Sequence, residues 1–172
     1  MKKPVVIINC SAKKLAVPAM AADLYCDPNS LNHMVNKHLG RAGGDCADVL
    51  ILSAHYGLIS ARDELAPYES KMPSDDASIE EWVGQHKRRS LAVLNETLDG
   101  RDVFVLLTKN YLNAFSQIIE GSPVSQRLKS MRVSTDHVGI LQLKGRLKRT
   151  LLHIKGEPMP EDLSLVLGSQ AR

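Results

Sequence analysis

The sequence predicts a single three-layer α/β domain, with a mostly parallel sheet and helices on both of its faces. Three short runs rich in Val, Ile and Leu, at residues 5–10, 48–54 and 102–108, are separated by segments with helical patterns. These runs are continuously apolar rather than alternating, which is typical of parallel strands covered on both faces. The chain has 172 residues, and one domain with a full core is the usual organisation at that length.

Four segments carry helical signals between and after the predicted strands. They span residues 30–41, 79–98, 110–119 and 136–154. We expect the first helix to stop at the two glycines Gly43 and Gly44. Ser78 and Glu81 have the spacing of a capping box, which predicts the start of the second helix. The last segment repeats its apolar residues at helical spacing and keeps most of its basic residues off that stripe.

Two further segments are predicted to be irregular. Residues 55–78 are polar, acidic and contain prolines, so we expect a functional loop over the strand ends. Residues 1–155 would then form the domain, and residues 156–172 a flexible carboxyl-terminal tail, because this stretch contains two prolines and ends in small and polar residues.

Several common classes of protein do not fit the sequence. No apolar run approaches the roughly 18 residues of a membrane span, and the amino terminus lacks a signal-peptide pattern, so we expect a cytoplasmic protein. Cys10, Cys26 and Cys46 lack CxxC spacing, which favours reduced thiols and argues against a structural metal site. Phosphate-loop, dinucleotide and nucleophile-elbow signatures do not occur, and no cofactor is predicted.

The charge of the chain is unevenly distributed although its net value is only +3. Residues 127–155 contain eight Lys or Arg and one acidic residue, whereas residues 60–81 are acidic. We expect Arg132, Lys144, Lys148 and Arg149 to contact nucleic-acid phosphates. A solvated basic helix explains the same pattern.

Small and polar residues follow the first two predicted strands. Cys10 ends the first run, and Ser11, Lys13 and Lys14 follow it; open α/β sheets bind ligands at this end of their strands. The second run is followed by a comparable group. It contains Ser53, His55, Tyr56 and Gly57. If the two strands are neighbours, these groups line one cleft.

The residue types of this cleft suggest roles in catalysis and binding. Lys14 could be a nucleophile or hold a phosphate, Cys10 could be a nucleophile, and His55 a general base. Ser11 and Ser53 supply hydroxyl groups, and Gly57 permits a tight turn or a close approach to a ligand. The structural alternatives are a solvated lysine, a core cysteine and a surface histidine.

Four short motifs, taken in order, resemble a known family. They are Cys10-Ser11-Ala12-Lys13-Lys14-Leu15, Ala22-Asp23-Leu24-Tyr25, Ile51-Leu52-Ser53-Ala54-His55-Tyr56-Gly57-Leu58-Ile59 and Ala66-Pro67-Tyr68-Glu69. This order resembles the YaaA-like bacterial and phage domains, and it is more distantly similar to the core of archaeosine synthase. The resemblance implies an α/β fold and a link to nucleic acids or nucleobases. It nominates Lys14 as a base-attacking lysine, or Lys13 in the YaaA register.

Three functions therefore remain open. The first is an enzyme acting on the glycosidic bond or base of a modified nucleotide, in DNA, in tRNA or free, with Tyr25 and Tyr68 stacking on the base. The second is a non-catalytic nucleic-acid-binding module, and the third is a sensor of small nucleotides. Neither a metal nor a cofactor enters any of them.

Overall fold

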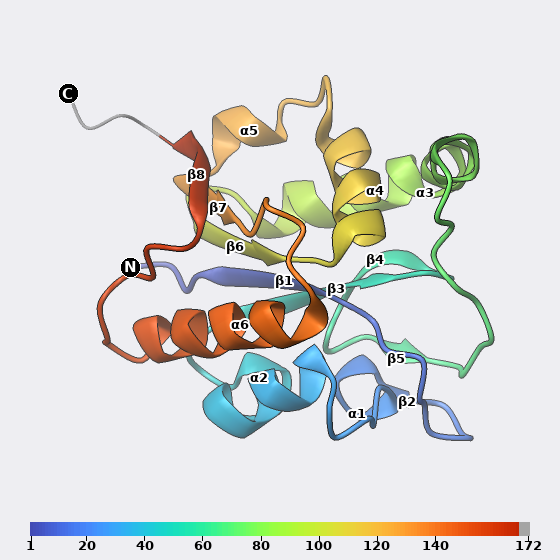
Figure 1. The fold of residues 1–172 in the computed structure, drawn as a ribbon, viewed down its shortest axis with the longest axis horizontal. Helices are drawn as coiled ribbons and strands as arrows, with labels where there is room; N and C mark the ends of the chain where they lie inside the picture. Colours follow the sequence, from blue (N-terminus) through green and yellow to red (C-terminus); the bar gives the residue numbers. More distant parts are fainter. Residues whose placement is uncertain (169–172) are drawn as a thin grey trace.

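The computed structural model describes residues 1–168 and confirms the α/β fold (Figure 1). Its central sheet has six strands in the order β4-β3-β1-β6-β7-β8. They are β1 Val5–Asn9, β3 Asp48–Ser53, β4 Gly57–Ser60, β6 Asp102–Leu106, β7 Ser130–Val133 and β8 Ser164–Gly168. The four inner strands are parallel, and the edge strands β4 and β8 pair antiparallel with their neighbours. A separate two-stranded sheet pairs β2 (Ala19–Met20) with β5 (Glu64–Leu65).

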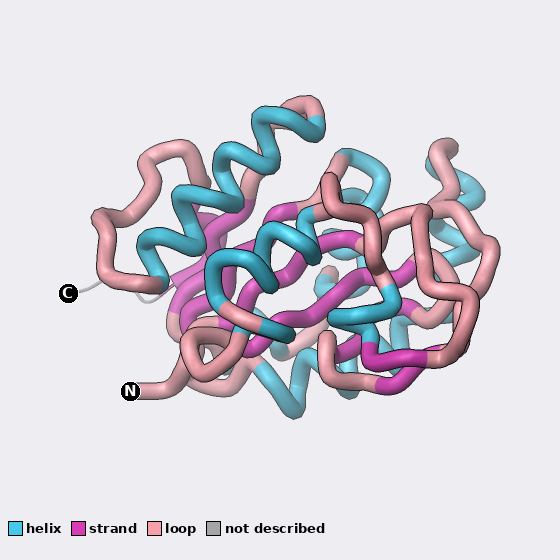
Figure 2. Tube along the Cα trace, turned by 90° about the horizontal axis from the view of Figure 1, so that it is seen from below, coloured by secondary structure: helices cyan, strands magenta, loops and turns pink. Residues whose placement is uncertain are grey.

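Helices cover both faces of the central sheet. They are α1 Ala21–Leu24, α2 Leu31–Leu39, α3 Asp76–Thr97, α4 Lys109–Ile119, α5 Val124–Arg127 and α6 Ile140–Ile154, with a 3₁₀ turn at Arg41–Gly43. Helix α2 packs against α6 on one side, and α3 packs against α4 on the other (Figure 1). Figure 2 shows the strands enclosed between these helices. Across residues 1–168, every helix is too short or too polar to cross a membrane.

The core explains why the predicted strands are continuously apolar. In β1, the side chains from Val5 to Ile8 are fully buried, and those of β3 and β6 are buried after the first residue of each strand. Because helices lie on both faces, residues that point up and residues that point down both require apolar side chains. The register pairs Ile8 with Ile51 of β3 and Leu106 of β6, so the three predicted strands are direct neighbours.

The ends of the predicted helices differ from the structure by a few residues. Helix α2 ends before Gly40, whose φ of +90° leaves the helical conformation ahead of Gly43 and Gly44. The amino-terminal cap of α3 is Asp75, which accepts a hydrogen bond from the backbone N–H of Ser78, so the predicted capping box is wrong. Helix α6 begins after Gly139, four residues later than predicted for residue 136.

Residues 55–78 are only partly the predicted loop. Residues 57–60 form β4, and Leu58 and Ile59 are buried against the sheet. The three residues 54–56 form a hairpin turn of ordinary length between β3 and β4, and the strand was missed because residues 55–78 were treated as one polar loop. The irregular part that remains begins after β5, at residue 66.

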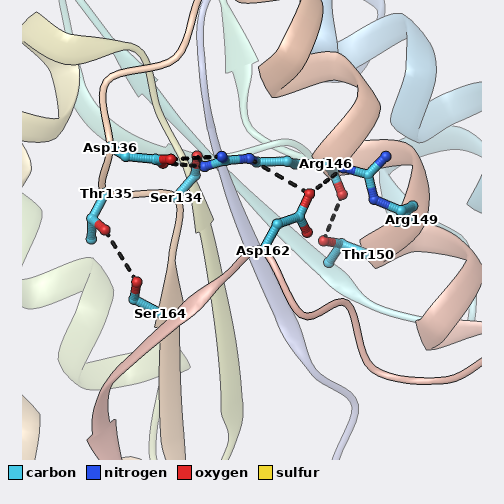
Figure 3. A network of polar contacts seen from close by, with 8 residues as sticks. All are labelled: Ser134, Thr135, Asp136, Arg146, Arg149, Thr150, Asp162 and Ser164. Carbon is cyan, nitrogen blue, oxygen red and sulfur yellow. Dashed lines mark hydrogen bonds and ion pairs between the residues drawn. The ribbon is translucent and has the colours of Figure 1, made fainter.

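The predicted tail is wrong for residues 164–168, which form the edge strand β8 beside β7. Figure 3 shows what holds this segment in place. The guanidinium of Arg146 lies 3.6 Å from Asp162 and binds both carboxylate oxygens of Asp136, while Arg149 also pairs with Asp162. The hydroxyl groups of Thr135 and Ser164 form a hydrogen bond with 3.2 Å between their oxygens. The last four residues of the predicted tail, 169–172, lie outside the described residues.

Because Asp136 and Arg146 form an ion pair, we expect the free energy of unfolding to decrease in acid. Hydrogen bonding by Arg146 lowers the pKa of the Asp136 carboxyl group to about 2 from 3.8. A carboxyl group with a lowered pKa stabilises the fold above its unfolded pKa, and this contribution disappears as the pH falls from about 4 to 2. We expect Asp136→Asn to be less stable than wild type at pH 6, with the difference vanishing near pH 2, in urea unfolding at each pH.

The control for this experiment is Asp45→Asn. Asp45 is exposed and makes no ion pair with any residue from 1 to 168. Its profile should follow that of wild type, and an Asp136→Asn profile parallel to wild type from pH 6 to pH 2 would contradict the assignment.

Candidate functional site

A cavity lies where the chain leaves neighbouring strands toward opposite faces of the sheet. After β1 the chain continues to α1 and α2, and after β6 it enters α4 on the other side (Figure 1). Such switch points between adjacent parallel strands are where open α/β sheets bind ligands. The cavity has a volume of about 220 Å³, and its wall combines the end of β1, the start of α4 and residues 70–72.

Two features make this cavity suitable for an anion. The Oγ of Ser11 is buried and has no hydrogen-bond partner. Helix α4 begins at the cavity, and its first intrahelical backbone bond is donated by Leu112, which leaves the N–H groups of residues 109–111 without helical acceptors. The cap residue Thr108 makes no side-chain capping bond. Backbone N–H groups at a helix start, together with the helix dipole, favour negative charge.

Cys10 and Asn9 join the ends of β1 and β6 beside the cavity. The Sγ of Cys10 lies 3.2 Å from the hydroxyl of Tyr111, on the first turn of α4. The amide of Asn9 accepts a hydrogen bond from the backbone N–H of Thr108 at 3.1 Å. Cys10 is 8% exposed and faces the cavity as part of its wall. The two strand ends are therefore held at a fixed separation.

A chain of hydroxyl groups connects the end of β3 to the loop that follows β5. The Oγ of Ser53 accepts hydrogen bonds from the backbone N–H groups of His55 and Tyr56, and donates one to the hydroxyl of Tyr68 at 2.8 Å. The Tyr68 hydroxyl lies 2.7 Å from that of Tyr25. Three hydroxyl protons make two hydrogen bonds within this chain, so one phenolic proton remains for a further acceptor.

Burial keeps these phenols neutral. It raises the pKa of Tyr25 to about 12, and it also raises the pKa of Tyr68 and of Tyr111 above the ordinary value for tyrosine. At neutral pH each hydroxyl therefore keeps its proton and can act as a hydrogen-bond donor.

Lys14 and His55 both contact the ring of Tyr68. The Lys14 ammonium lies 4.3 Å from the ring centroid and donates a hydrogen bond to the carbonyl oxygen of Ala12 at 3.0 Å. The His55 ring stacks on Tyr68 with 4.9 Å between centroids, and its Nδ1 lies 3.2 Å from Ser70. Lys13 is exposed and makes none of these contacts. The two lysines that the motif left as alternatives therefore differ in their surroundings, because only Lys14 contacts the Tyr68 ring.

Helix α3 fixes the turn that carries His55. The indole N–H of Trp82 donates to the carbonyl oxygen of Ala54 at 2.8 Å, and the Nε2 of His86 lies 2.9 Å from the His55 carbonyl oxygen. Gly57 has a φ of +75°, and a Cβ there would come within 2.9 Å of the Ser90 hydroxyl on α3. Gly57 thus provides the expected tight turn, but its close neighbour is α3 rather than a ligand site.

The remaining predicted site residues are distributed over different surfaces. Tyr56 donates to the carbonyl oxygen of Ala66 at 3.0 Å and packs edge-on against Tyr68. The four basic residues expected to bind nucleic acid do not form one surface. Arg132 lines a cavity together with Met1 and Lys2. On α6, Lys144 and Lys148 face α2, whereas Arg149 pairs with Asp162. No cluster of three metal-ligating side chains occurs within residues 1–168.

Comparison with protein-family models matches residues 5–140 to a family of unknown function, DUF6884. The chain belongs to this family. The match includes all the strand ends that form the candidate site and stops at the first residue of α6. No curated protein and no solved structure matches the chain in the same kind of comparison.

Two residues of this DUF6884 site were missed by sequence reasoning. Tyr111 reaches Cys10 from α4, and Ser70 contacts His55 from the loop after β5. The signal for Tyr111 was present, because residues 102–108 were predicted as a strand and residues 110–119 as a helix. The end of that third strand should have been included beside the first two. Nothing in the sequence around Ser70 indicates where its loop folds.

Ser53 should be the most sensitive hydroxyl in the site. Ser53→Ala leaves two partly buried backbone N–H groups without their acceptor and removes the bond to Tyr68, so the free energy of unfolding should fall by about 2–3 kcal/mol. Tyr68→Phe removes only the hydroxyl and should cost about 1 kcal/mol. Urea unfolding of both variants measures this, and equal losses would show that the backbone bonds to Ser53 contribute nothing.

Proposed function

We propose that this protein is an enzyme that acts on the glycosidic bond or the base of a modified nucleotide. The observation that carries the proposal is the unpartnered Ser11 hydroxyl beside the start of α4, in a cavity at the sheet's switch point. A phosphate bound there would accept hydrogen bonds from the first N–H groups of α4 and from Ser11. Lys71, which also lines the cavity, would add a positive charge.

The aromatic cluster next to this cavity supports a nucleotide over a simple anion. Tyr25, Tyr68, Tyr56 and His55 lie within 6.4 Å of a neighbouring ring in this cluster. Tyr25 is only 1% exposed and cannot stack on a base itself, whereas His55 is exposed and Tyr56 is partly exposed. Exposed aromatic side chains bind bases by stacking, and each stack contributes about 1–3 kcal/mol. Ser70 links the two groups, because it lines the cavity and its Oγ lies 3.2 Å from the Nδ1 of His55. A phosphate at α4 and a base toward the tyrosines would place the sugar near Cys10.

Lys14 is the residue we propose to act on the substrate. A carbonyl oxygen and an aromatic face are both suitable partners for an ammonium group, which favours a cation that stabilises the departing base. In this reaction water adds to the anomeric carbon, the glycosidic bond breaks, and the base leaves with the bonding electrons and takes up a proton. The spare phenolic proton of the Tyr68–Tyr25 pair is a second donor for that base.

The motif resemblance agrees with this proposal. The Cys-Ser-x-x-Lys segment of the YaaA-like pattern comprises Cys10, Ser11 and Lys14, and these residues lie together at the end of β1. The distant likeness to the archaeosine synthase core suggests the nucleophilic alternative, in which the Lys14 amine itself attacks the anomeric carbon or the base. That route would leave a covalent adduct, whereas hydrolysis by water would not.

Removal of the Lys14 ammonium should abolish turnover. We expect wild-type protein incubated with modified DNA or tRNA to release a base, detected by mass spectrometry, and Lys14→Ala to lose at least 100-fold of this activity. Lys13→Ala is the matched control and should retain it, because Lys13 is exposed. An adduct trapped by borohydride in wild type and absent in Lys14→Ala would assign the nucleophilic role. Equal activity of the two variants would contradict a role for Lys14.

One observation favours a second function, a non-catalytic nucleic-acid-binding module. No acidic side chain lines the cavity, although carboxylates commonly act as nucleophile or acid in glycosidic chemistry. Under this alternative no base is released from any substrate pool. Binding of nucleic acid would then weaken steeply with salt and would be unchanged in Lys14→Ala.

A further inference from the structure

A groove between α2 and α6 is lined by positively charged and titratable side chains. His33, Lys37 and His38 come from α2, and Lys144 and Lys148 from α6. Its volume is about 320 Å³, and it shares no lining residue with the cavity at Ser11. Most of the groove's α6 wall lies beyond residue 140, where the family match ends.

The positive charge of this groove is not neutralised by neighbouring carboxylates. Neither α2 nor α6 contains an acidic residue, and Lys37, Lys144 and Lys148 form no ion pair within residues 1–168. The arginines of α6 differ in this respect, because Arg146 and Arg149 are both paired with carboxylates (Figure 3). Helix α6 therefore presents paired arginines in one direction and unpaired lysines toward α2.

The titration of His38 is consistent with a positive potential in the groove. Burial lowers the pKa of His38, and nearby Lys148, Lys37 and Lys155 lower it further. Lys148 belongs to α6, Lys37 belongs to α2, and Lys155 directly follows α6, so charge from both walls acts on this side chain.

We propose that the α2–α6 groove binds closely spaced phosphate groups. Lysine ammonium groups bind phosphate as mobile point charges. Lys144 and Lys148 lie one helical turn apart on α6 and face Lys37 on α2. The histidine rings of His33 and His38 add hydrogen-bond donors between these charges. The same chemistry is offered by the backbone of a nucleic-acid strand and by a free polyphosphate.

The test compares two double variants that remove equal charge. Lys144→Gln with Lys148→Gln alters the groove, and Arg88→Gln with Arg89→Gln removes two exposed cations from α3, on the other side of the sheet. The probe is a fluorescein-labelled 12-nucleotide single strand, as DNA and as RNA, followed by anisotropy from 50 to 200 mM NaCl. Inorganic tripolyphosphate is titrated separately.

The groove variant should bind the single strand at least 10-fold more weakly than wild type, while the α3 variant stays within 2-fold. The slope of log affinity against log salt should decrease by about 1.4 in the groove variant, as for two phosphate contacts to a single strand. Tripolyphosphate should displace the strand. Binding of tripolyphosphate alone, lost in the groove variant, would identify a free polyphosphate as the ligand.

Equal weakening in both double variants would overturn the proposal, as would a wild-type protein that binds neither probe at 50 mM NaCl. The result is independent of the proposed enzymatic activity. Lys14→Ala should bind the single strand as wild type does, so a loss of base release with normal strand binding concerns the enzyme proposal alone.

Discussion

Strand β1 is hydrogen-bonded on both sides, to β3 and to β6, and its side chains from Val5 to Ile8 have no exposed surface. This position constrains the rest of the molecule. Because β1 and β6 are parallel neighbours, their carboxyl ends lie side by side, and the chain turns from them to opposite faces of the sheet. The space between these two departures is the cavity at Ser11, so the site follows from the strand order.

Polar groups around this cavity are fixed mainly by contacts with the backbone. Ser53 is held by two backbone N–H groups, His55 by the carbonyl contact to His86, and Asn9 by the N–H of Thr108. These bonds orient the tyrosine hydroxyls and the Lys14 ammonium before any ligand is bound. Ser11 is the exception, because its buried hydroxyl has no partner. The unmet hydrogen bond costs about 1–3 kcal/mol and could be satisfied by a ligand.

Much of the fold could be predicted from local patterns, because buried parallel strands and amphipathic helices have distinct periodicities. The strand runs beginning at Val5, Asp48 and Asp102 were all confirmed. The short edge strand β4 was missed because it follows its partner β3 through a tight turn. The short edge strand β8 was missed because its partner β7 is distant in the sequence. β8 in particular requires Asp162 to meet Arg146, a contact that no local pattern indicates.

The part of the candidate site that could be predicted consists of the residues at the ends of the predicted strands. Ser53, His55 and Cys10 could be placed together because they follow neighbouring strands, whereas Ser70 and Tyr111 depend on how a loop and a helix start fold back. The predicted surface of basic residues did not form, since helical periodicity sends Lys148 and Arg149 in different directions. Charge counting along a chain detects basic residues but not the carboxylates that pair with them.

We propose that the end of β1 and the start of α4 bind the phosphate of a nucleotide. The most direct measurement is a ¹H–¹⁵N NMR titration of the full chain with nucleoside 5′-monophosphates. The largest shifts should occur at the backbone amides of Ser11, Lys109 and Asn110, and they should saturate together. Shifts confined to the α2–α6 groove, or no saturable shift at these amides, would contradict it.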